Sequence, residues 1–239
     1  MELAAKDRII VALDVPTLRE AHLLAEQLGG YVGAFKVGLE LITSEGAPQV
    51  VKEMKRFGNV FFDGKFSDIP NTVGNASRAV AQMGVWMFDV HASSGLGSMQ
   101  AAVQNRGNSL VFAVTVLTSI DMNECVSVFG GFPNTKVIQL AGSAYEAGCN
   151  GVICSPKEVG DISKSFNGLL TAVPGVRPRW AATNDQKRIM TPGDAIKAGA
   201  DYLVIGRPIT SPPSETGDSI RAAQLIAEEI DQALAESGR

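Results

Sequence analysis

The feature that most constrains the fold is a set of eight short apolar runs that recur along the whole 239-residue chain. Each is a near-continuous stretch of apolar, β-branched and aromatic residues, which is typical of strands buried on both faces of a parallel sheet. The runs cover residues 8–14, 33–39, 59–65, 85–91, 110–117, 150–155, 168–175 and 201–207. Between them lie segments with the spacing of amphipathic helices, clearest at 17–28, 44–58, 72–84, 135–148 and 219–236.

The alternation of strand and helix predicts an α/β protein, with a parallel sheet covered by helices. Eight such units in 239 residues match a closed (β/α)₈ barrel, or TIM barrel, which typically takes about 250 residues. An open doubly wound sheet is the alternative, and it is disfavoured because no G-x-G-x-x-G follows the first strand. No linker or shift of composition divides the chain, so we predict one barrel domain over residues 1–239.

Charge and cysteine content narrow the class of protein. A net charge of −4 argues against non-specific binding to nucleic acid or to an anionic membrane. The three cysteines have no metal-type spacing and indicate reduced thiols, so we expect a cytoplasmic protein. The first residues do not resemble a signal peptide, and no run reaches the roughly 18 apolar residues of a membrane span.

Polar side chains end nearly every predicted strand, which is the end where such barrels carry their active sites. These residues are Asp14, Lys36, Asp63, Lys65, His91, Thr115, Thr118, Ser155, Arg177 and Arg207. Asp63 and Lys65 are two positions apart, so both side chains are expected in the barrel mouth, with Gly64 turned toward the helices. Charges clustered in this way indicate an active site, and ion pairs that merely close the barrel are the structural alternative.

The segment DGKFSDIPNTV, residues 63–73, resembles the D-x-K-x-x-D-I-P-x-T motif of the bacterial-type orotidine 5′-monophosphate decarboxylase family. Further segments that resemble the family follow its order at 11–16, 35–41, 114–119, 174–178, 185–192 and 202–210. The resemblance therefore covers most of the chain. It implies a (β/α)₈ barrel that converts orotidine 5′-monophosphate to UMP, the last step of de novo pyrimidine synthesis, with no metal and no organic cofactor.

The resemblance also implies roles for the charged residues. Lys36, Asp63, Lys65 and Asp68 would form a tetrad of alternating charge, in which Lys65 protonates C6 of the pyrimidine. Asp68 and Thr72 would reach into the neighbouring subunit, giving a homodimer with shared active sites.

Other matched residues are implied to bind the nucleotide. Arg177, Gly206 and Arg207 follow strands seven and eight, where barrels commonly bind phosphate. Gln186 lies in the long 175–191 loop, which the resemblance implies is a lid over the phosphate.

Asp14 and Thr118 are implied to bind a ribose hydroxyl and the pyrimidine edge. Without the resemblance we would interpret Asp14 as a turn residue and Thr72 as a helix cap. Gly64 and Ser67 depart from the family pattern, which has larger side chains there, and this puts only the local rigidity in doubt.

Two rival functions stay open. Metal-dependent 3-keto-L-gulonate 6-phosphate decarboxylases and hexulose phosphate synthases share D-x-K-x-x-D, but they carry an acidic residue where this chain has Lys36. A non-catalytic nucleotide-binding barrel would keep the phosphate site alone, and the complete tetrad disfavours it.

Overall fold

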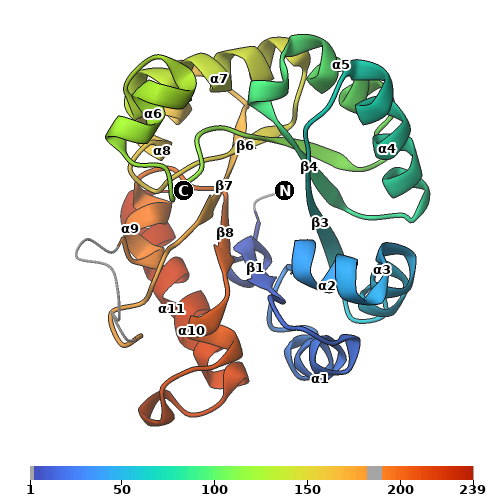
Figure 1. Cartoon of the computed structure of the whole chain (residues 1–239). Helices are drawn as coiled ribbons and strands as arrows, with labels where there is room; N and C mark the ends of the chain where they lie inside the picture. The colour runs from blue at the N-terminus through green and yellow to red at the C-terminus, as the bar shows by residue number, and fades with distance from the viewer. Residues whose placement is uncertain (1–2, 182–189, 239) are drawn as a thin grey trace.

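The structure is a computed structural model that describes residues 3–181 and 190–238. Its strands pair in parallel and in chain order, and β8 pairs with β1, so the barrel is closed. Figure 1 shows the helices surrounding this ring of strands. The predicted TIM barrel is confirmed. The strands are β1 (Ile9–Ala12), β2 (Ala34–Val37), β3 (Asn59–Phe66), β4 (Met87–His91), β5 (Leu110–Val114), β6 (Gly151–Ile153), β7 (Leu170–Pro174) and β8 (Tyr202–Ile205).

The helices cover the outside of the barrel (Figure 1). They are α1 (Leu18–Leu28), α2 (Leu39–Glu45), α3 (Ala47–Met54), α4 (Pro70–Gln82), α5 (Leu96–Gln104), α6 (Met122–Phe129), α7 (Pro133–Ala147), α8 (Val159–Ser165), α9 (Pro192–Lys197), α10 (Arg207–Thr210) and α11 (Ser219–Ser237). Short 3₁₀ turns lie at Ala5–Arg8, Ala92–Ser94 and Ser214–Thr216. Within the described residues, no helix is both long and apolar enough to cross a membrane.

The prediction of one helix over 44–58 is wrong. Helix α2 begins earlier, at Leu39, and a break at Gly46 separates it from α3. Gly46 has φ of +84°, a conformation that glycine adopts without a steric penalty. Proline follows in the first turn of α3, where its missing N–H is not needed.

Apolar side chains fill the barrel except at its carboxyl end. Inside the barrel, large side chains such as Phe61, Met87 and Phe112 are almost fully buried. A second and larger core lies between the strands and the helices, and Phe62 and Phe88 belong to it. Lys36, by contrast, is charged yet only 8% exposed, and it lies near the end of β2 in the barrel mouth.

The pairing of β3 with β4 is irregular. Phe62 lies opposite Phe88, and the next recorded pair is Phe66 with Val90. Residues 63–65 of β3 therefore face a single residue of β4, Asp89. Within this bulge Lys65 has φ of +48°, the one positive value outside glycine in the described residues. This strand end is therefore shaped differently from a regular strand.

Candidate active site

A chain of alternating charges crosses the barrel mouth. The Lys36 ammonium lies 2.8 Å from Asp14 Oδ1 and 3.0 Å from Asp63 Oδ2. The other oxygen of Asp63 pairs with the Lys65 ammonium. Strands β1, β2 and β3 thus bring Asp14, Lys36, Asp63 and Lys65 together. Asp63 and Lys65 project into the mouth together, as predicted.

The charges of this cluster stabilise one another. Burial opposes the ionisation of Asp63, but Lys36 and Lys65 outweigh it and lower the pKa of this carboxyl to about 2. Burial likewise opposes the charge of Lys36, and Asp63 and Asp14 together raise the pKa of this amine above its ordinary value. Near neutral pH the site therefore holds fixed charges that are already in place before a substrate arrives.

Asp89 is a further carboxyl group in the cluster, and it is not among the residues predicted from the sequence. It is 0% exposed on β4, and its Oδ1 accepts a hydrogen bond from the Lys65 backbone N–H at 2.7 Å. Its Oδ2 lies 3.9 Å from the Lys65 ammonium. Burial and the neighbouring Asp63 charge raise the pKa of Asp89 well above its ordinary value. One signal was present: Asp89 is a lone acid within the apolar run 85–91.

Asp68 and Thr72 lie apart from Lys36, Asp63 and Lys65, the other three residues of the predicted tetrad. Both are exposed, in the loop after β3 and in the first turn of α4. Asp68 Oδ1 accepts a hydrogen bond from the Ile69 N–H at 2.6 Å. Among the described residues no ion pair joins Asp68 to Lys36 or Lys65. Thr72 does not cap α4, whose N-cap residue is Ile69.

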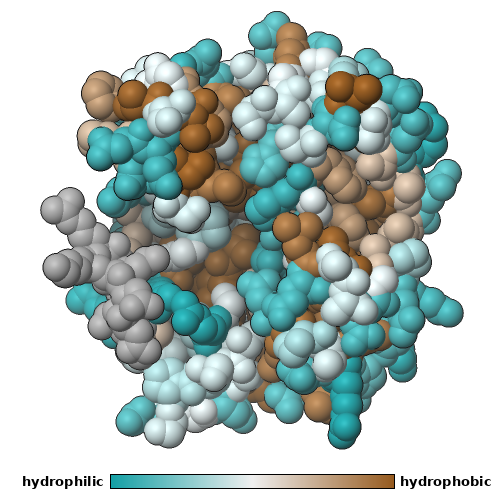
Figure 2. All heavy atoms as spheres, viewed as in Figure 1, coloured by the Kyte–Doolittle hydropathy of each residue, from teal (hydrophilic) through white to brown (hydrophobic). Residues whose placement is uncertain are grey.

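A cavity of about 210 Å³ opens beside the charges. Lys36, Asp63 and Lys65 form its polar side, and Thr118 belongs to its lining. The remaining lining is largely apolar and comprises Phe61, Val114, Val116, Leu117, Ile153, Cys154, Pro174 and Val204. Figure 2 shows a central hollow with hydrophobic residues inside and hydrophilic ones around it. The cavity suits a flat, largely apolar ring with one edge against fixed charges.

The predicted phosphate ligands follow β7 and β8. Arg207 is exposed and begins α10, directly after Gly206. Arg177 is half-buried after β7, and its backbone N–H donates a hydrogen bond to Met190 O at 3.1 Å. Gln186 lies outside the described residues, as does much of the 175–191 loop. Arg177 and Arg207 are therefore at the carboxyl end of the barrel, as predicted.

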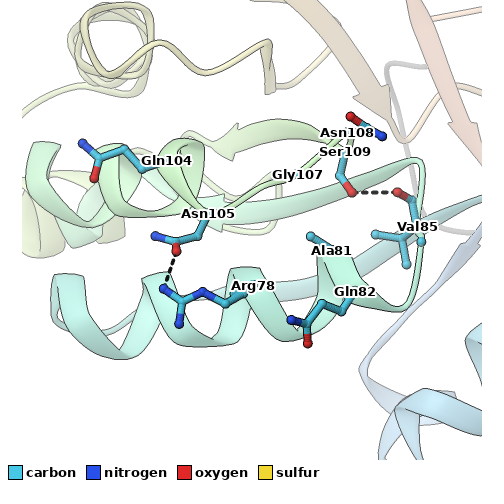
Figure 3. A pocket seen from close by; sticks show the side chains of 10 residues that line it. Arg78, Ala81, Gln82, Val85, Gln104, Asn105, Gly107, Asn108 and Ser109 are labelled. Atoms are coloured by element: carbon cyan, nitrogen blue, oxygen red, sulfur yellow. Dashed lines mark hydrogen bonds between the residues drawn. The ribbon is translucent and has the colours of Figure 1, made fainter.

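A larger hollow, of about 610 Å³, lies between α4 and α5 (Figure 3). Ser109, which lines it, precedes β5, so this hollow lies at the opposite end of the barrel from the charges. Arg78 points toward it but is bonded to Asn105 Oδ1 at 2.6 Å. Its lining lacks the combination of buried carboxylates and amines, so we place the active site at the smaller cavity.

The Lys36 ammonium occupies the position between two carboxylates that a cation would take. Within the described part of the chain, no group of three or more His, Cys, Asp and Glu side chains is arranged to hold a metal ion. The positive charge between Asp14 and Asp63 is instead supplied by a side chain.

Comparisons with known proteins show which family the chain belongs to. Residues 7–221 match the orotidine 5′-phosphate decarboxylase / HUMPS family. The orotidine 5′-phosphate decarboxylase of Moorella thermoacetica is 44% identical over 97% of this chain and 95% of its own length. That of Halorhodospira halophila is 45% identical over 96% and 98%. The crystal structure of the Lactobacillus acidophilus orotidine 5′-phosphate decarboxylase superposes with a TM-score of 0.80 at 30% identity, over 93% of this chain and 98% of that one. The chain therefore belongs to the orotidine 5′-phosphate decarboxylase / HUMPS family.

Proposed function

We propose that this protein decarboxylates orotidine 5′-monophosphate to UMP, in de novo pyrimidine synthesis, and that Lys65 protonates C6 of the ring. The family match and the relatives with this activity over nearly their full length support the reaction. One observation supports the role of Lys65 above all: its ammonium pairs with buried Asp63 and lines the cavity beside the charge cluster.

The chemistry explains why such a cluster is needed. Loss of CO₂ leaves an electron pair on C6, in the plane of the ring, where the π system offers no ordinary sink. A cation held next to that carbon stabilises the developing charge without having to reorganise. The Lys65 ammonium serves as that cation and then transfers a proton to C6. Asp63 and Lys36 hold the ammonium in place through the paired charges described above.

The cavity binds the base, and the rest of the nucleotide extends from it. Its volume of about 210 Å³ is below the roughly 300–1,000 Å³ of pockets that enclose a whole ligand. Thr118 therefore contacts the pyrimidine edge, and Asp14, which is largely exposed, contacts the ribose. Arg177, Arg207 and the backbone at Gly206 bind the phosphate, together with Gln186.

Turnover of orotidine 5′-monophosphate, followed by ultraviolet absorbance, tests the reaction directly. The Lys65→Ala variant tests the proton donor: we expect UMP binding to persist and kcat to fall by several orders of magnitude. Near-normal kcat in this variant would exclude Lys65 as the donor. No turnover by the unmodified protein would refute the reaction itself.

Lys36 separates this function from the metal-dependent one. Its ammonium lies between Asp14 and Asp63. The 3-keto-L-gulonate 6-phosphate decarboxylases and hexulose phosphate synthases carry an acidic residue at this position, which helps to bind their metal. We therefore expect EDTA to leave kcat unchanged. A loss of activity with EDTA that added Mg²⁺ restores would favour the metal-dependent reaction.

We propose further that the protein acts as a homodimer in which Asp68 and Thr72 complete the partner's site. Both are exposed, and between them the apolar Ile69 is 66% exposed, which suits a surface covered by a second copy. Mixing Asp68→Asn and Lys65→Ala proteins tests this, because hybrid dimers contain one intact site. Activity that stays at background after verified subunit exchange would contradict shared sites.

Two other expectations stay predictions. The single-domain organisation over residues 1–239 is checked by limited proteolysis, which is expected to leave one core fragment. The cytoplasmic location is checked by cell fractionation.

A further inference from the structure

We propose that Asp89 is a positioning residue for the reaction: its carboxylate holds the Lys65 backbone in the conformation that directs the ammonium to Asp63 and the cavity. The inference rests on the proposed role of Lys65 as proton donor. It assigns to Asp89 no contact with the substrate.

The conformation of Lys65 needs an explanation. Its φ of +48° lies in the left-handed region, which side chains with a Cβ disfavour. Such a conformation persists where the surrounding structure fixes it, and it occurs preferentially at functional sites. At this point of β3 the surrounding structure includes the bulge opposite β4.

Asp89 supplies the hydrogen-bond acceptor that the bulge removes. In a regular pair of parallel strands, a backbone N–H that points toward the neighbouring strand donates to a carbonyl of that strand. Residues 63–65 outnumber the β4 residues opposite them, and the Lys65 N–H instead donates to Asp89 Oδ1 at 2.7 Å. The carboxylate thus takes the place of a backbone acceptor, and regular pairing resumes at Phe66.

The position of Asp89 is costly for any purely structural purpose. The residue is 0% exposed, and its Oδ2 has no hydrogen-bond partner among the described residues. A buried polar atom left in this way requires a compensating role. The charged or titratable groups that face the carboxylate are Lys65 and Asp63 from β3, and the half-buried His91 lies further along β4. Asp89 is thus bonded to the Lys65 backbone and lies beside the Lys65 amine.

Loss of the acceptor is expected to displace the reacting group. Without Oδ1 the Lys65 N–H is left unbonded, and the local backbone is free to leave the left-handed region. A shift of about 1 Å at a reacting group can lower the rate by about 10²-fold. The substrate is held by other residues, so KM is expected to change little.

The experiment measures kcat and KM for orotidine 5′-monophosphate in Asp89→Asn and Asp89→Ala. Asparagine keeps an oxygen that accepts the Lys65 N–H but cannot ionise, whereas alanine removes both the acceptor and the ionisable group. We expect Asp89→Ala to lose about 10²-fold in kcat with KM within about threefold. Asp89→Asn is expected to recover most of that loss.

Asp201→Ala is the matched control. Asp201 also accepts a backbone N–H with its carboxylate, that of Thr171 at 2.9 Å, but it lies before β8, at the opposite end of the barrel. Asp201→Ala is expected to lower the melting temperature and to keep kcat. A loss of kcat in Asp89→Ala alone would therefore not be explained by reduced stability.

Two results would overturn the proposal while the unmodified protein remains active. One is a normal kcat in Asp89→Ala. The other is an equal loss in the asparagine and alanine variants, because the carboxylate charge and not the acceptor would then matter. If Asp89→Ala does not fold, Asp89→Ser replaces it. The serine hydroxyl is one atom closer to its own backbone than the aspartate oxygens, so it does not reach the place of Oδ1. Normal kcat in Asp89→Ser would equally overturn the proposal. Inactive wild-type protein would instead refute the proposed function.

Discussion

Replacing Lys65 by glycine is expected to give a more stable protein than replacing it by alanine. Both variants remove the ammonium, so the loss of the ion pair with Asp63 cancels between them. What differs is the backbone at φ of +48°. A left-handed conformation costs a residue with a Cβ about 1–2 kcal/mol, and it costs glycine nothing. In an ordinary strand the same alanine-to-glycine change destabilises by about 0.5–1 kcal/mol through entropy.

The two effects oppose each other, and the strain is the larger. We therefore expect the free energy of unfolding of Lys65→Gly to exceed that of Lys65→Ala by about 0.5–1 kcal/mol. In a chain of this size that difference raises the melting temperature by about 1–4 °C.

Urea denaturation and calorimetry of the two variants measure this difference. Ala113→Gly on β5, two strands away, is a control in a regular strand, and it is expected to lower stability. If Lys65→Gly were the less stable variant by the ordinary cost of glycine, the left-handed backbone would carry no strain in the folded protein. Asp89 would then have no strained backbone to hold in place.

Three other predictions concern Asp63, Gly64 and the residues proposed to bind the phosphate. The pKa of Asp63, about 2, lies below the ordinary value of about 3.9, so its ion pairs stabilise the fold fully above pH 4 and are lost as the pH falls toward 2. Wild-type protein is therefore expected to lose about 2 kcal/mol more than Asp63→Asn between pH 4 and pH 2, measured by urea titration at each pH. A Cβ on Gly64 would come within 2.5 Å of Phe62 Cε1, so Gly64→Ala is expected to cost about 1–3 kcal/mol in the free energy of unfolding, and Phe62→Leu in the same chain to recover part of it. Arg207→Ala is expected to lower kcat/KM more than Gln186→Ala, because the guanidinium brings a positive charge and two N–H donors to the phosphate, whereas the glutamine amide is neutral. Steady-state kinetics checks the last point, and a larger loss in the glutamine variant would contradict it.

The sequence was sufficient for the architecture because strands buried on both faces have a pattern that few other structures share. The meeting of Asp63 and Lys65 was predicted from the alternation of a regular strand, whereas in the structure it occurs within a bulge. The break at Gly46 could have been predicted, since glycine and a nearby proline interrupt the helical pattern there. The apolar spacing on either side favours one continuous helix, and the structure has two instead.

Three features could not be derived from local pattern. Lysine has no preference for a positive φ, so the conformation of Lys65 depends on its contacts in the folded barrel. Asp89 belongs to a run that predicts a buried strand, and its partner is 24 positions away. A larger residue at position 64 is excluded by the rings of Phe62 and Phe66, which only the folded strand brings together.

The bulge between β3 and β4 also matters to anyone who would transfer this chemistry to another barrel. Residues 63–65 face Asp89 alone, so the two strands advance by different numbers of residues over the same length of barrel. Grafting the Asp-Gly-Lys sequence onto a regular strand would reproduce the side chains and misdirect the amine. A designer would therefore have to transfer β3 and β4 together. The bulge in their pairing would have to be copied as well as the residues.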